Sequence, residues 1–156
     1  MRSLVLYESQ FGNTRHIAEL IANRLGTFGD TRLMPATDCK PAALADVDLV
    51  VIGAPTQAHG VTPGMRRFLT ELQPVHGIKA AAFDTRVKGP RFLWGSAARE
   101  IAIHLERKGF EMVVPPESFL VTLSKEPALY AGEEEHAAGW AAVLGAVYRE
   151  PAAIGG

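Results

Sequence analysis

The sequence has few of the features that mark specialised classes of protein. Its 156 residues contain one cysteine, Cys39, so no disulfide can form within the chain, and a lone thiol fits a reducing compartment. No apolar run approaches the roughly 18 residues that a membrane-spanning helix needs. The formal net charge of −1 argues against a nucleic-acid binder held by bulk positive charge. The chain starts with a strand-like segment rather than a cleavable signal pattern, and we therefore expect a cytoplasmic location.

Motifs of metal binding, hydrolysis and nucleotide binding are missing as well. Cys39 has no cysteine or histidine nearby, the histidines show no metal-ligand spacing with acidic neighbours, and we predict no metal ion. No Ser-His-Asp, Cys-His or paired-carboxylate arrangement is readable, which gives no support to hydrolytic or glycosidic chemistry. Neither G-x-x-x-x-G-K-[ST] nor G-x-G-x-x-G occurs, so the nucleotide P-loop and the dinucleotide fingerprint do not apply.

What the chain does contain is a regular alternation of apolar runs and helix-period segments. Strands are expected at Leu4–Tyr7, Thr31–Met34, Asp48–Ala54, Lys79–Phe83 and Phe110–Val114, with a β-like continuation over Ser118–Leu123. Helices are expected between them and over Glu133–Arg149, with Thr62 and Ser96 as caps. The alternation predicts a three-layer α/β/α sandwich around a five-stranded parallel sheet of order 2-1-3-4-5. We assign residues 1–150 to this single domain and 151–156 to a loose tail.

A polar turn joins the first strand to the first helix. It consists of Ser9, Gln10, Phe11, Gly12, Asn13 and Thr14. The unpaired amides and the dipole at a helix start favour a phosphate, two hydroxyls could donate to it, and glycine lets the backbone come close. The alternative is an ordinary turn in which Asn13 or Thr14 caps the helix. The local pattern leaves both interpretations open.

The motif S-Q-F-G-N-T directly after a first strand resembles the FMN-phosphate loop of flavodoxins, whose usual pattern is [ST]-x-[ST]-G-[NT]-T. Ser9, Gly12, Asn13 and Thr14 match this pattern, whereas Phe11 replaces a residue that commonly carries a hydroxyl. The resemblance is to flavodoxins of the short-chain type and extends over roughly residues 3 to 148. It implies that the chain binds FMN.

Two further segments resemble the loops that hold the flavin ring in this family. In G-A-P-T-Q-A-H-G the resemblance implies contacts from Pro55, Thr56, Gln57, Ala58, His59 and Gly60. The aromatic ring often found in this loop is missing, and His59 is the nearest substitute; an exposed His59 without a ligand is the alternative.

The third segment, D-T-R-V-K-G-P-R-F-L-W-G-S-A-A, implies contacts from Asp84, Thr85 and Arg86. Trp94 and Phe92 are candidates to stack on the ring, and core packing is the alternative for both. Trp140, on the stripe of the last helix, is expected in the core.

The resemblance implies an electron-transfer protein that carries electrons on a non-covalent flavin. The alternatives are a flavin-dependent NAD(P)H:quinone or protoporphyrinogen oxidoreductase, for which the chain has little surplus length, and a flavodoxin-like domain without flavin. Basic residues of the third segment, with Asp84 as its one acid, favour a less negative flavin potential than that of acidic flavodoxins. They also favour an acidic redox partner or a phosphorylated or carboxylated substrate. The sequence leaves the oligomeric state open.

Overall fold

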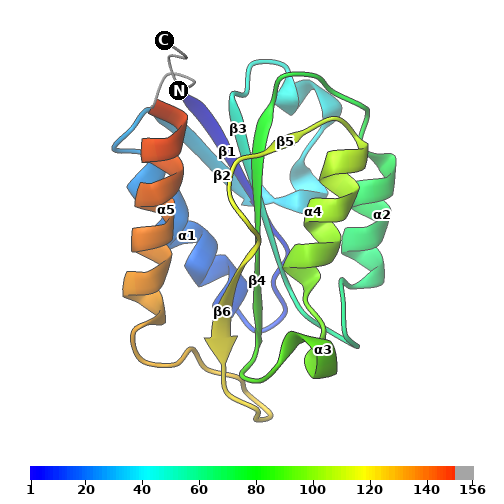
Figure 1. The fold of residues 1–156 in the computed structure, drawn as a ribbon, viewed down its shortest axis with the longest axis vertical. Coiled ribbons are helices and arrows are strands. Elements are labelled where there is room, and N and C mark those ends of the chain that lie inside the picture. Colours follow the sequence, from blue (N-terminus) through cyan, green and yellow to red (C-terminus); the bar gives the residue numbers. More distant parts are fainter. Residues whose placement is uncertain (150–156) are drawn as a thin grey trace.

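The strands form one parallel sheet in the predicted order. The computed structural model describes residues 1–149, apart from the side chains of Arg91 and Phe92; the predicted tail 151–156 lies outside the described residues. The sheet order is β2-β1-β3-β4-β5, and a sixth strand, β6, also pairs with β4 (Figure 1). The strands are β1 (Arg2–Tyr7), β2 (Asp30–Pro35), β3 (Leu49–Pro55), β4 (Lys79–Val87), β5 (Glu111–Met112) and β6 (Glu117–Val121).

Helices cover both faces of the sheet. The helices are α1 (Asn13–Leu25), α2 (Pro63–Glu71), α3 (Arg91–Trp94), α4 (Ala97–Arg107) and α5 (Glu133–Arg149), with short 3₁₀ turns η1 (Ala36–Asp38) and η2 (Pro41–Leu44). Helices α1 and α5 lie on one face, and α2 and α4 lie on the other (Figure 1). The predicted three-layer architecture is therefore confirmed.

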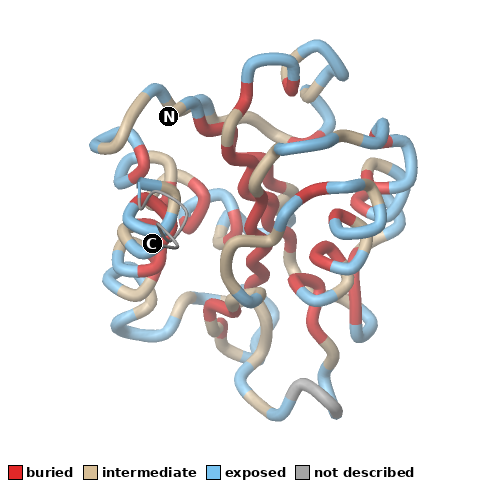
Figure 2. The backbone as a smooth tube through the Cα atoms, turned by 45° about the horizontal axis from the view of Figure 1, so that its top comes forward, coloured by how far each residue is buried: buried red, intermediate tan, exposed pale blue. Residues whose placement is uncertain are grey.

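The apolar runs form the core between these layers. Figure 2 shows the buried residues along the central strands and on the inner sides of the helices. On the α1/α5 face, the rings of Phe83, Phe119 and Trp140 pack edge to face with centroids 5.8 to 6.1 Å apart. Trp140 is 7% exposed, which confirms its predicted place in the core.

The fourth and fifth strands differ from the prediction. β4 continues to Val87, four residues beyond the predicted end, because β3 and β6 supply partners on both sides for Asp84 and Thr85. The polar residues after Phe83 concealed this extension. The expected fifth strand, Phe110–Val114, is shortened to β5, which pairs with the start of β4, and the expected continuation over Ser118–Leu123 is β6, which pairs with its end. Pro115 and Pro116 lie at the break, since proline has no amide to donate to a sheet.

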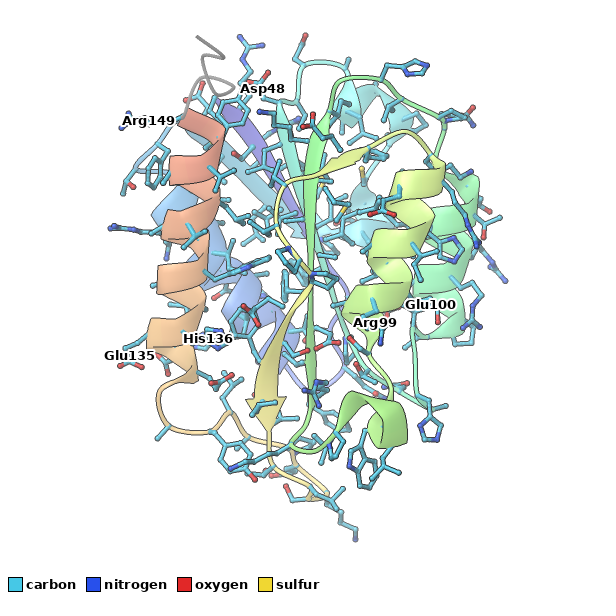
Figure 3. The ribbon with its side chains drawn as sticks, in the orientation of Figure 1. Asp48, Arg99, Glu100, Glu135, His136 and Arg149 are labelled. Atoms are coloured by element: carbon cyan, nitrogen blue, oxygen red, sulfur yellow. The ribbon has the colours of Figure 1, made fainter. Side chains whose placement is uncertain are left out.

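Helix α5 is fixed to β6 by polar and aromatic contacts at its start. His136 lies there (Figure 3), with its ring centroid 4.6 Å from that of Phe119. Glu133 Oε2 accepts a hydrogen bond of 2.7 Å from the Leu120 amide. These contacts hold the β6 segment against the edge of the sheet. Among residues 1–149, no helix has both the length and the apolar character needed to cross a bilayer.

Candidate functional site

Three loops meet where β1, β3 and β4 end. The first follows β1 (residues 8–12), the second follows β3 (residues 56–62), and the third follows β4 and includes α3 (residues 88–96). The Glu8 amide donates to the Gly53 carbonyl at 3.0 Å, and the Thr56 amide donates to the Thr85 carbonyl at 2.9 Å. The side-chain amide of Gln57 donates to that of Gln10 and connects the second loop to the first. This edge lies at the switch point between β1 and β3, where open parallel sheets bind ligands.

The start of α1 is open toward an anion. Gly12 is the N-cap with φ 89°, no side chain caps the helix, and its first turn contains no acidic residue. A Cβ placed on Gly12 would have no atom within 4 Å, so the space in front of it is free. The alternative in which Asn13 or Thr14 caps the helix is therefore wrong. Backbone amides with a positive dipole end remain for an anionic group.

The side chains of the predicted phosphate loop fix its shape. Ser9 Oγ accepts the Gly12 amide at 3.0 Å. Asn13 Nδ2 donates to the Pro127 carbonyl at 2.7 Å, and the Thr14 hydroxyl lies 2.7 Å from that of Thr85. Asn13 thereby connects the loop to the segment after β6, a contact that no local sequence pattern indicates.

Two adjoining cavities form a groove between the loops. One, of about 110 Å³, is lined by Gln10, Phe11, Asn13, Thr14, Pro55, Thr56, Gln57, Thr85, Arg86, Val87, Val121 and Pro127. The other, of about 250 Å³, is lined by Thr56, Ala58, His59, Arg86, Val87 and Trp94. The cavities share Thr56, Arg86 and Val87, and none of the lining residues carries a carboxylate. The polar side chains of this groove can donate hydrogen bonds and none is negatively charged, which fits a ligand with a phosphate.

The second loop contains a tight turn of unusual backbone conformation. Gln57 and Gly60 exchange backbone hydrogen bonds of 2.8 and 2.9 Å. Between them Ala58 and His59 have φ values of 46° and 72°, which costs side-chain-bearing residues roughly 1–2 kcal/mol each. Such strain is frequent at ligand clamps.

The third loop passes directly over this turn. A Cβ on Gly95, which has φ 76°, would lie 1.9 Å from the His59 carbonyl oxygen. Trp94 beside it is 41% exposed and lines the larger cavity together with His59. Core packing is therefore wrong for Trp94, and its predicted stacking on a ring stays a prediction. The Phe92 side chain lies outside the described residues.

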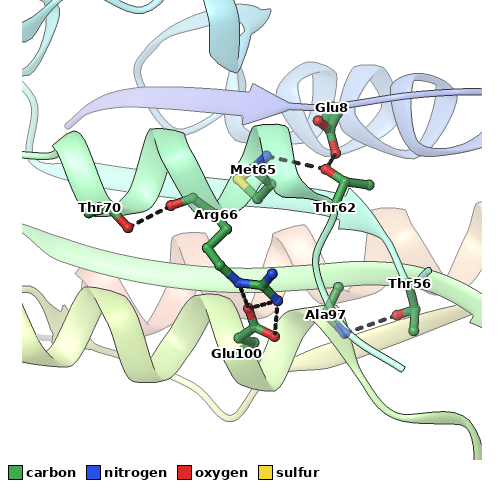
Figure 4. A network of polar contacts seen from close by, with 8 residues as sticks. All are labelled: Glu8, Thr56, Thr62, Met65, Arg66, Thr70, Ala97 and Glu100. Carbon is green, nitrogen blue, oxygen red and sulfur yellow. Dashed lines mark hydrogen bonds and ion pairs between the residues drawn. The ribbon is translucent and has the colours of Figure 1, made fainter. Parts of the chain in front are cut away.

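Asp84 holds the second and third loops together and lines neither cavity. Its carboxylate is fully buried, and Oδ2 accepts from Ser96 Oγ at 2.7 Å, from the Ala98 amide at 3.0 Å and from Thr56 Oγ1 at 3.1 Å. Thr56 Oγ1 in turn accepts the Ala97 amide at 2.9 Å (Figure 4). The predicted ligand residue Asp84 thus organises the start of α4.

A second polar network, which the sequence did not indicate, fixes the end of the β3–α2 loop. Thr62 caps α2 as predicted, accepting the Met65 amide at 3.2 Å, and its hydroxyl donates to Glu8 (Figure 4). Arg66 and Glu100 connect α2 and α4 at 3.1 Å. Residues 1–149 contain no group of three or more side chains arranged to hold a metal ion.

Comparison with known proteins agrees with this geometry. A family model described as a flavodoxin domain matches residues 4–86, which is more than half of the chain. A search of curated proteins finds no match.

Solved structures show the same fold. A flavodoxin from the domain Archaea superimposes with a TM-score of 0.75 at 20% identity, over 95% of this chain and 99% of that one. Flavodoxin 2 of Bacillus cereus superimposes with a TM-score of 0.76 at 22% sequence identity, over 94% of this chain and 98% of that one. The rubredoxin oxygen:oxidoreductase of Desulfovibrio gigas superimposes with a TM-score of 0.74 at 19% sequence identity, over 94% of this chain and 36% of that one. Together with the family match, the fold shows that the chain belongs to the flavodoxin domain family of redox proteins.

Proposed function

We propose that the protein binds FMN non-covalently and acts as an electron carrier. The supporting observation is the groove whose lining includes Asn13 and Thr14, at the uncapped start of α1, and no carboxylate. Ser9 and Gly12 line a neighbouring cavity, which also contains Glu8. The phosphate would be held by the backbone amides of the first turn of α1, which begins at Asn13, and the ring would lie toward His59 and Trp94. Bound FMN would supply the redox chemistry; the chain binds it, orients it and keeps water from one side.

We further propose that the redox partner docks around this groove. Exposed apolar side chains lie on the loops and on α3 at this end of the sheet: Phe11, Leu93, Trp94, Leu123 and Tyr130. Lys88 lies 5.6 Å from the centroid of the Tyr130 ring, and Lys125 follows Leu123 closely in the chain. An apolar centre with basic neighbours favours a partner whose contact surface is apolar and acidic at its rim. We propose a cytoplasmic setting for this exchange, because Cys39 stays a free thiol under reducing conditions.

The first test is the visible spectrum of the purified protein before and after incubation with FMN and desalting. Retained flavin absorbance near ~450 nm supports the proposal. The loaded protein should accept electrons from a chemical reductant and should not oxidise NAD(P)H unaided. Rapid NAD(P)H oxidation with a quinone present would instead indicate the enzyme alternative, and a protein that stays colourless would indicate a domain without flavin.

A matched pair of variants tests the phosphate end of the groove. In Ser9→Asp the new carboxylate can still accept the Gly12 amide, so the loop is expected to fold, but its charge repels a phosphate. FMN affinity should fall at least about tenfold, the change expected from losing or opposing a charged hydrogen bond, while riboflavin affinity changes little. Ser124→Asp, at an exposed position after β6, is the control and should bind FMN like the wild type.

A further inference from the structure

Arg86 lies at the junction of the two cavities, and the protein supplies hydrogen-bond acceptors for only part of its guanidinium group. It lines both of them, and its guanidinium donates through Nη1 to the Gly89 carbonyl at 2.7 Å and the Val87 carbonyl at 3.3 Å. Its Nε is buried and has no hydrogen-bond partner within residues 1–149. A buried donor on a cation is costly to leave unpaired, so the guanidinium is expected to gain free energy from an acceptor on a bound ligand.

Carboxylates of the described residues do not supply this acceptor. Arg86 makes no ion pair with any of them. Asp84, two residues earlier on the same strand, directs Oδ2 to three donors of the second and third loops. The charge of Arg86 therefore faces a groove without acids.

We propose that Arg86 is the anion-recognition residue of this groove, with its guanidinium donating to an anionic oxygen of the ligand. The proposal rests on the proposed function and deepens it by assigning the contact that neutralises the ligand's charge. Two oxygens of FMN share the required chemistry: the phosphate, and the pyrimidine end of the ring, which gains negative charge on reduction. Because the planar guanidinium presents several N–H donors in fixed directions, lysine is not an equivalent replacement.

The neighbouring cation Lys88 provides a matched control. It belongs to the same loop but lines neither cavity, and its ammonium lies over the Tyr130 ring. Lys88→Met therefore removes one positive charge near the groove without removing a donor from it. Any effect of bulk charge on ligand affinity will appear in this variant as well.

The decisive experiment follows the Arg86 Nε–H signal by ¹H–¹⁵N NMR, assigned by its absence in Arg86→Lys, during titration with FMN, riboflavin and inorganic phosphate. We expect the signal to shift on addition of FMN. Arg86→Met should weaken FMN binding about tenfold or more, Arg86→Lys should fall between it and the wild type, and Lys88→Met should stay within about twofold.

Riboflavin has the ring but no phosphate, so it distinguishes the two candidate partners of Arg86 on FMN. If the phosphate is the partner, Arg86→Met changes the affinity for FMN but not for riboflavin. If the ring is the partner, both affinities fall, and the potential of the second reduction step of bound FMN becomes more negative. A wild-type protein that binds neither flavin overturns the proposed function, whereas a signal that shifts with phosphate alone still supports anion recognition. An Nε–H signal unmoved by all three ligands overturns the inference.

Discussion

The hydroxyl oxygens of Thr14 and Thr85 lie 2.7 Å apart at buried positions and join the first turn of α1 to the end of β4. Thr85 also accepts the Thr56 amide through its carbonyl, at 2.9 Å. One strand residue thus connects the start of α1, after the predicted phosphate loop, with the second loop. Together with the contact between Gln57 and Gln10, this connection fixes how the two loops lie beside each other.

Thr85→Val should destabilise the protein by about 1–2 kcal/mol, because the Thr14 hydroxyl is then left buried without a partner. Urea unfolding followed by circular dichroism measures the loss. The double variant Thr14→Val/Thr85→Val should cost less than the sum of the single variants, since it leaves no orphaned hydroxyl. Additive losses would contradict this account. Thr70→Val, at an exposed helix position, should change stability by less than about 0.5 kcal/mol.

The fold was largely predictable from sequence because its signals are local. The continuous apolar run over Leu49–Ile52 specifies a buried central strand, and Thr62-Pro63 specifies a helix start. The length of β4 was not predictable in this way. Three of its last four residues are polar, and they are strand because β3 pairs with Asp84 and Thr85, and β6 pairs with all four after the break at Pro115-Pro116.

The candidate site was predictable as a set of loops but not as a set of roles. Motif resemblance selected Asp84 and Arg86 alike as ligand contacts. The structure separates them: Asp84 is buried behind the loops, and Arg86 lines the groove. The contribution of Pro127 depends on how the segment after β6 returns to the sheet, which no local pattern encodes.

Asp84→Ala should destabilise the protein by about 3 kcal/mol or more, because Thr56, Ser96 and the Ala98 amide lose one common acceptor. Asp84→Asn should lose less, since its carbonyl can replace Oδ2. Denaturant unfolding gives both values, with Asp46→Asn at an exposed position as the control. Equal stability of the Ala and Asn variants would show that the accepted hydrogen bonds contribute little.

Cys39 should react slowly with thiol reagents in the folded protein near pH 8. Burial raises the pKa of its thiol above the ordinary value of 9.0, while the positive charge of Arg32 acts in the opposite direction. Reaction with an aromatic disulfide reagent should accelerate in urea, and Arg32→Met should slow it further in the folded state. A folded thiol as reactive as the unfolded one would contradict the burial.

The same pKa shift predicts a pH effect on stability. Below pH 9.0 the thiol is neutral in both states, and its full contribution to stability is present. Above that pH the unfolded chain ionises first, so stability is lost as the pH rises toward and through the folded pKa. The free energy of unfolding of the wild type should therefore decline relative to that of Cys39→Ser between pH 8 and pH 10.5. Parallel pH profiles would contradict the shift.

Gly95→Ala should disturb the groove far more than an equivalent change elsewhere. Gly95 and Gly77 have φ values of 76° and 80°, so alanine is strained at both, by roughly 1–2 kcal/mol. Only at Gly95 would the added Cβ meet another atom, the His59 carbonyl oxygen at 1.9 Å; at Gly77 nothing lies within 4 Å. Relieving that overlap must move the third loop away from the second and separate Trp94 from His59. We therefore expect Gly95→Ala to lose more stability than Gly77→Ala and, unlike Gly77→Ala, to alter Trp94 fluorescence and weaken FMN binding. Equal effects of the two variants would mean that the approach of Gly95 to His59 does not shape the groove.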